Sequence, residues 1–176
     1  HKKQNMLFKN IIGQEKIKNI LRNSADNNHI AHAISLFGQN GIGKFKLALA
    51  YLQYLNCQNP QNGDSCNQCP NCRMFNNFAH PNLHLIYPIV KPDNAKTVTC
   101  LDFFENFQKL LSEKDYFDLN DWINYLGTDN KQIRIFENES TQIAETISNP
   151  PYNKGYKGII IWQPDKMNDV FANKIL

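Results

Sequence analysis

A glycine-rich loop that leads directly into a helix-forming stretch is the feature that most constrains how this chain can fold. Residues 38–45 read GQNGIGKF, close to the pattern of a phosphate-binding loop. The glycines let successive backbone N–H groups converge on an anion, and the lysine adds a positive charge. The candidate cofactor-binding residues are Gly38, Gly41, Gly43 and Lys44.

The metal ligands that nucleotide hydrolysis needs are missing at two places. Phe45 stands where the pattern requires a Ser or Thr hydroxyl for Mg²⁺. A second, acidic ligand is expected after a later hydrophobic strand, but Gln163 and Pro164 follow the apolar run 159–162. We therefore expect no efficient ATP hydrolysis. Two alternatives stay open for the loop: residual phosphate or ATP binding, and a purely structural tight turn.

Four cysteines follow the loop at spacings that suit a metal. Two-residue gaps allow neighbouring thiolates to chelate one ion, and a set of four thiolates leaves no open position for catalysis. The sequence therefore predicts a structural zinc in a knuckle spanning 57–72, with four free thiols as the alternative. The candidate ligands are Cys57, Cys66, Cys69 and Cys72. Cys100 lies outside the cluster and is expected to be a buried, small apolar residue.

Short apolar runs alternate with amphipathic stretches along the chain. We expect buried strands at 31–37, 83–87 and 158–162 and helices at 14–25 and 44–56, with a loop or knuckle at 58–74. Such alternation predicts an α/β fold, a parallel sheet with helices on both faces.

One domain is expected to fill 1–176. The run 168–176 looks like the opening of a helix, which predicts that the domain continues beyond Leu176. Two amphipathic helices are expected inside 91–131.

Composition excludes some classes of protein. The formal charge is +3, too small to argue for nucleic-acid binding by itself. No apolar run approaches the length of a membrane span, and the polar N-terminal residues do not resemble a signal peptide. We therefore expect a cytoplasmic protein with no membrane contact, a setting in which clustered cysteines usually bind metal.

Several motifs together resemble one known family, the N-terminal domain of the delta-prime subunit of the bacterial DNA polymerase III clamp loader. The resemblance covers most of the chain, and a zinc knuckle inserted into a phosphate-loop domain makes it specific. The matching stretches are IIGQE at 11–15, HA at 32–33, the glycine loop, LNC at 55–57, the Cys-x₂-Cys-x₂-Cys run, HP at 80–81, IIIW at 159–162, DKMN at 165–168 and AN at 172–173.

The resemblance implies an AAA+ module in a pentameric ring that opens the sliding clamp and places it on primed DNA. A delta-prime subunit would act there as a rigid stator, part of the polymerase holoenzyme without ATP turnover of its own. Its partners would be the gamma/tau and delta subunits, and the clamp and DNA through the complex. The isolated fragment is expected to be a monomer. Segment 91–131 departs from the family, because it is longer than the usual link.

Two other functions remain open from the sequence. One is an ATP-hydrolysing motor subunit of the gamma/tau type, which shares the knuckle; the defects at Phe45, Gln163 and Pro164 argue against it. The other is a zinc-based nucleic-acid-binding module. That function requires cations around the knuckle, and Arg73 is the only one between Cys57 and His80.

Overall fold

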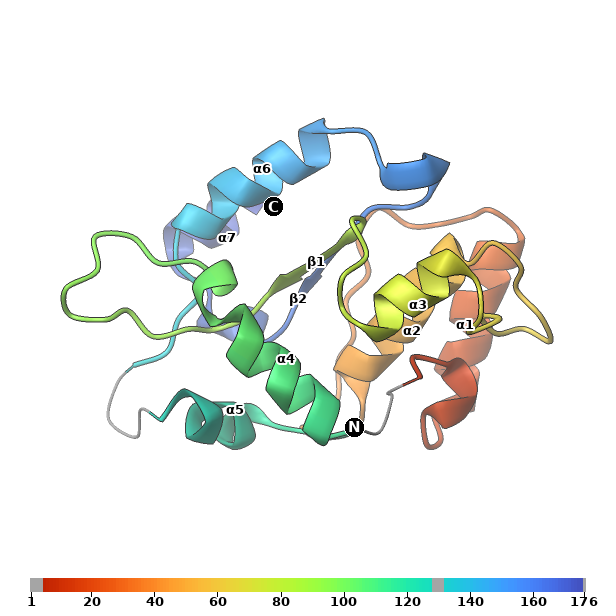
Figure 1. Ribbon diagram of the computed structural model, residues 1–176, viewed down its shortest axis with the longest axis horizontal. Coiled ribbons are helices and arrows are strands. Elements are labelled where there is room, and N and C mark those ends of the chain that lie inside the picture. Colours follow the sequence, from red (N-terminus) through yellow and green to blue (C-terminus); the bar gives the residue numbers. More distant parts are fainter. Residues whose placement is uncertain (1–4, 128–131, 176) are drawn as a thin grey trace.

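A pair of parallel strands lies at the centre of the protein. The computed structural model describes residues 5–127 and 132–175. Strand β1 (Leu83–Ile86) pairs with β2 (Gly158–Ile161), with Leu83 opposite Gly158 and Ile86 opposite Ile161. Figure 1 shows α4 and α6 on opposite sides of this pair, with α2 and α3 toward one end. The predicted α/β class is confirmed as a mixed fold with a small parallel sheet.

Seven α-helices surround the strands in the described residues: α1 (Glu15–Asp26), α2 (Lys44–Asn56), α3 (Pro70–Asn76), α4 (Phe104–Glu113), α5 (Leu119–Leu126), α6 (Asn138–Ser148) and α7 (Asp169–Ile175). Short 3₁₀ turns lie at η1 (Phe8–Asn10), η2 (Cys100–Phe103), η3 (Tyr152–Lys154) and η4 (Pro164–Lys166). Over 5–127 and 132–175, no helix combines the length and the apolar character that crossing a bilayer requires.

The first residue of β2 shows why helix α2 can pack so closely on the sheet. A Cβ built on Gly158 would stand 2.5 Å from both δ carbons of Leu52 in α2. A larger residue at this position would force the Leu52 side chain to shift. The aliphatic residues that follow Gly158 then pack at the margin of the same core.

The main hydrophobic core joins α2, β1 and the two helices of segment 91–131. Phe107 of α4 stacks on Tyr87 with ring centroids 3.8 Å apart. Trp122 of α5 is fully buried, and its indole N–H donates to the Pro88 carbonyl at 2.6 Å. Both predicted amphipathic helices of this segment therefore form and bury aromatic residues. A second, smaller core lies between η1, α1 and α2.

The predicted strand at 31–37 is wrong for this structure. No β-bridge within the described residues involves this stretch. Its side chains are mostly exposed, Phe37 by 90% and Ile34 by 44%. A strand needs a neighbour to satisfy its backbone N–H and C=O groups, and β1 and β2 pair only with each other here. The complete parallel sheet of an AAA+ module is accordingly not formed by the described residues.

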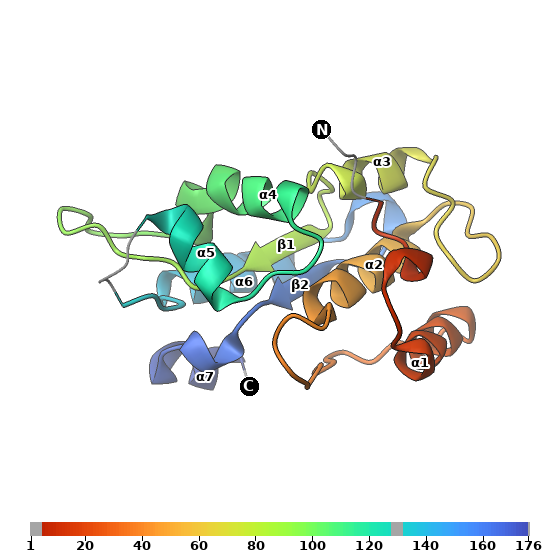
Figure 2. The ribbon, with the colours of Figure 1, turned by 90° about the horizontal axis from the view of Figure 1, so that it is seen from below.

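The predicted loop at 58–74 is also wrong in part, because α3 begins inside it. Pro70 occupies the first helical position, where a missing N–H costs nothing. The Cys69 sulfur accepts a hydrogen bond from the backbone N–H of Cys72 and so caps the helix. Figure 2 shows α3 lying beside α2, with the long loop of the knuckle leading into it.

Candidate metal centre and glycine loop

Four cysteine sulfurs meet at the junction of α2, the following loop and α3. All four lie within 4.8 Å of one another. The Cys72 sulfur is 3.6 Å from that of Cys57 and 3.9 Å from that of Cys66. With Zn–S bonds of about 2.3 Å, a tetrahedral site would place its sulfurs about 3.8 Å apart. The separations fit a four-thiolate metal site, formed by the residues that the sequence predicted.

Backbone N–H groups point at three of these sulfurs. Cys66 N donates to the Cys57 sulfur at 3.2 Å, Cys69 N to Cys66 at 3.3 Å, and Cys72 N to Cys69 at 3.4 Å. Such bonds favour the thiolate over the thiol. The loop backbone therefore already supplies donors for a set of metal-binding thiolates.

The thiols of the cluster differ in pKa because their surroundings differ. Burial raises the pKa of Cys66, but hydrogen bonds from the backbone N–H groups of Gln68 and Cys69 and from the Cys57 and Cys69 side chains together lower it, and the pKa falls to about 6. Burial raises the pKa of Cys72 far above its usual range, and its neighbours Cys69 and Cys57 raise it further. Thiolates this close repel one another unless a metal ion neutralises them.

Polar side chains fix the knuckle to the rest of the protein. The Asp64 carboxylate accepts hydrogen bonds from the backbone N–H groups of Phe8, Lys9 and Ser65, at 3.0, 3.0 and 2.9 Å. On the opposite side, the Asn71 amide donates to the Asn56 carbonyl at 2.7 Å. Sequence reasoning missed these anchors, because Asp and Asn are ordinary loop residues and their partners lie far away in the chain.

The glycine loop contains glycines in the left-handed region, and its lysine bonds back onto the loop itself. Gly41 and Gly43 have positive φ angles of 74° and 85°. The Lys44 ammonium donates to the carbonyls of Gly38, at 2.8 Å, and Gln39. The cavity beside the loop has a volume of about 100 Å³, whereas small-molecule sites usually measure about 300–1,000 Å³. This cavity alone is smaller than a typical nucleotide site.

Phe45 is part of the hydrophobic core rather than of a metal site. Its ring packs edge-to-face against Phe107 at 5.7 Å, Phe117 at 5.6 Å and Trp162 at 6.4 Å between centroids. The position that carries the Mg²⁺-binding hydroxyl in a phosphate loop is therefore filled by buried carbon.

The segment after β2 does not provide the second metal ligand. Gln163 adopts a left-handed conformation with φ 58°, and Pro164 begins η4. The Asp165 carboxylate is largely exposed and pairs with Lys166 at 3.2 Å. Neither Gln163 nor Pro164 therefore places a carboxylate directly after β2.

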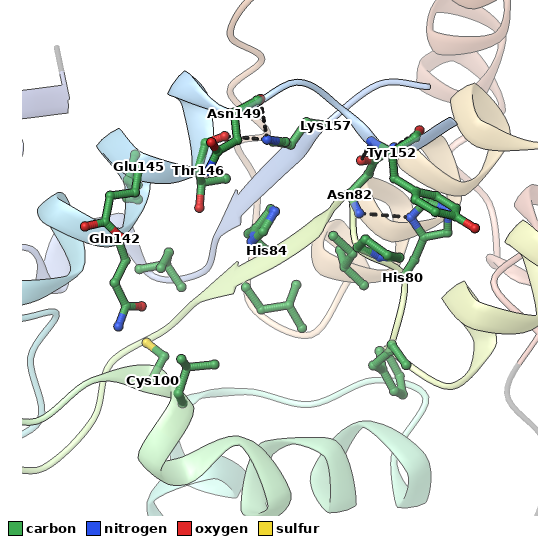
Figure 3. Close-up of a pocket in the computed structure, with 18 of the residues that line it drawn as sticks. His80, Asn82, His84, Cys100, Gln142, Glu145, Thr146, Asn149, Tyr152 and Lys157 are labelled. Carbon is green, nitrogen blue, oxygen red and sulfur yellow. Dashed lines mark hydrogen bonds between the residues drawn. The ribbon is translucent and has the colours of Figure 1, made fainter. Parts of the chain in front are cut away.

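A separate cavity of about 830 Å³ lies along β1, between α6 and η2 (Figure 3). His80 on its wall stacks on Phe75 at 4.3 Å, and its Nδ1 accepts from Asn82 N at 3.0 Å. Burial lowers the His80 pKa to about 4. The Lys157 ammonium donates to two carbonyls at the end of α6. The cavity is lined by none of the predicted site residues.

The chain matches one known protein family. A family model described as "DNA polymerase III, delta subunit" matches residues 13–176. The chain belongs to this family. The resemblance to a clamp-loader subunit is thereby confirmed at the level of the family, and a role in clamp loading follows from it. A comparison with curated proteins gives no match.

Membership of the delta subunit family covers both the cysteine cluster and the glycine loop, since the match begins at Gly13. It also covers segment 91–131, which contains α4 and α5. The match is to the family as a whole and does not separate a stator subunit from a motor subunit. That distinction depends on the chemistry of the glycine loop.

Proposed function

We propose that this delta-family chain is a non-catalytic stator of the DNA polymerase III clamp loader, of the delta-prime type. The observation that carries this proposal is the packing of Phe45 against Phe107 and Phe117. Restoring a hydroxyl there would open a hole in the core, and Gln163 and Pro164 still offer no acidic ligand. Neither half of a Mg²⁺ site is present.

A subunit that does not cycle through nucleotide states can serve as a fixed reference for neighbours that do. In this role the chain would adopt an AAA+ arrangement and contribute surface to the ATP site of a neighbouring subunit. Its partners would be the gamma/tau and delta subunits, and it would reach the sliding clamp and primed DNA through the complex.

The proposed cofactor is one structural zinc ion, held by Cys57, Cys66, Cys69 and Cys72. Zinc fits a set of four thiolates with no open position better than the harder divalent ions do. It would join the end of α2, where Cys57 lies, to the start of α3, where Cys69 and Cys72 lie. The ion would then stabilise the domain and take no part in a reaction.

Co-assembly tests the proposed function. The full-length protein should copurify with gamma/tau and delta subunits and should raise the DNA-dependent ATPase of the complex, while showing negligible ATPase alone. Failure to bind those subunits, or ATP turnover by the isolated protein at an ordinary motor rate, would overturn the stator assignment.

A further inference from the structure

The short connector between α4 and α5 lies against the glycine loop. Asp115, Tyr116 and Phe117 form this connector, which we name the aromatic connector. In Figures 1 and 2 it passes the N-terminal end of α2, where the loop enters the helix. It belongs to the segment for which the sequence suggested no role.

Tyr116 contacts both the segment before α1 and the glycine loop. Its hydroxyl oxygen accepts a hydrogen bond from the backbone N–H of Ile12 at 2.9 Å. Its ring lies directly on Gly43, since a Cβ built on that glycine would stand 2.8 Å from the Tyr116 ring. The ring therefore packs against the backbone immediately before α2. A side chain at Gly43 would collide with this ring, and the positive φ of Gly43 also favours glycine.

The two neighbours of Tyr116 bind the first turn of α2. Asp115 forms an ion pair with Lys46 at 2.7 Å, and the Lys46 side chain is only 10% exposed. Phe117 packs on Phe45 at 5.6 Å and on Trp162 at 5.0 Å between ring centroids. Each of the three connector residues therefore contacts a different residue at the junction of the glycine loop and α2.

The connector is itself fixed at both ends. Asp118 and Asp121 form a reciprocal capping box at the start of α5, with hydrogen bonds of 3.0 Å in each direction. Asp121 also pairs with Lys114, which directly follows α4. The connector is therefore short and held by an ion pair and hydrogen bonds at its ends.

We propose that the aromatic connector is an internal clamp that holds the glycine loop and the first turn of α2 in one conformation without nucleotide. In a phosphate loop that binds nucleotide, the phosphates and Mg²⁺ order this region. Here the ring of Tyr116, the Asp115–Lys46 ion pair and the Phe117–Phe45 contact do so instead. The inference stands on these contacts and does not depend on the clamp-loader role.

Trypsin cleavage after Lys44 in the folded, full-length protein measures the clamp. Lys44 bonds to carbonyls of its own loop and not to the connector, so its cleavage reports on loop motion and not on a lost ion pair. The D115A/Y116S variant should be cleaved there about fivefold faster than wild type, because local opening becomes easier. Mg²⁺–ATP should leave the wild-type rate unchanged.

Tyr125→Ser is the matched control. Tyr125 lies in the same segment, and its hydroxyl bonds to Glu113 rather than to the loop; cleavage after Lys44 should stay at the wild-type rate. If D115A/Y116S does not fold, Tyr116→Phe decides the matter, because it removes only the bond to Ile12 and should speed hydrogen exchange of the Ile12 amide. Unchanged cleavage in the folded double variant, unchanged Ile12 exchange in Tyr116→Phe, or a wild-type rate altered by Mg²⁺–ATP would overturn the proposal.

Discussion

The ring of Phe45 packs edge-to-face on the ring of Phe117, with centroids 5.6 Å apart and planes inclined at 69°. Phe45 is the residue that stands in the hydroxyl position of the glycine loop, and Phe117 comes from the connector more than seventy positions later. The residue that replaces the Mg²⁺-binding hydroxyl thus makes a packing contact in the core. A substitution that restores a hydroxyl at position 45 therefore removes the packing of Phe45 on Phe117.

Phe45→Thr should destabilise the protein and create no ATPase. Removing most of a buried aromatic ring leaves a cavity, and the free energy of unfolding should fall by about 3 kcal/mol. Denaturant unfolding and an ATPase assay on the full-length protein measure the two effects.

Phe37→Thr is the matched control for this substitution. Phe37 borders the same loop but is 90% exposed, so the same chemical change should alter stability by less than about 0.5 kcal/mol. Equal losses at both positions, or ATPase activity in Phe45→Thr, would contradict the structural account of Phe45.

Cys69→Ser should reduce zinc binding while the rest of the fold persists. Serine offers a harder, protonated oxygen in place of a thiolate, while its hydroxyl can still cap α3 as the Cys69 sulfur does. We expect wild-type protein to carry one zinc ion per chain and the variant to lose it to a chelator that leaves wild type loaded. Metal analysis after dialysis checks this.

Cys100→Ser provides the comparison. Cys100 is buried away from the cluster, where its sulfur lies between the backbone N–H and C=O of Tyr87 at 3.3 and 3.2 Å, and a hydroxyl can make the same two bonds. Zinc content should be unchanged. Loss of zinc from Cys100→Ser, or native wild-type protein without metal, would count against the proposed site.

Glu139 should make the protein less stable as the pH rises. Burial raises its pKa above the ordinary value of 4.5. One carboxylate oxygen accepts a short hydrogen bond from Cys100 N, and the other has no partner within the described residues. The folded state therefore holds the proton more tightly than the unfolded state. The contribution is full below about pH 4.5 and is lost as the pH rises through the folded pKa.

Glu139→Gln removes this titration but keeps the oxygen that accepts from Cys100. The variant should gain stability relative to wild type as the pH increases from about 4.5 to 7. Measuring unfolding of both proteins across this range isolates Glu139 from other groups, such as His80. A difference between them that does not vary with pH would show that Glu139 does not titrate in this way.

Local sequence patterns predicted the elements that depend on local physics. The helix expected at 44–56 and the two expected inside 91–131 form, because apolar spacing and caps such as the Gly127 C-cap of α5 act within a few residues. The strand at 31–37 does not form, although most of its residues are apolar. Strands depend on distant partners, which no local pattern reveals.

The candidate site shows the same division. The spacing of the cysteines identified all four members of the cluster, since metal chelation imposes short gaps. The anchors around it, such as Asp64 with Phe8 or Asn71 with Asn56, join segments that the sequence gives no reason to pair. The aromatic connector was missed for the same reason, since its aromatic residues are as suited to a core as to a clamp.

ATP turnover by a reconstituted clamp loader tests the central claim most directly when only Lys44 of this subunit is changed. Lys44→Ala should leave the DNA-dependent ATPase of the complex within about twofold of wild type, whereas replacing the corresponding lysine of the gamma/tau subunits should abolish most of it. A loss of activity on changing Lys44 comparable to that seen in a motor subunit would contradict the stator assignment.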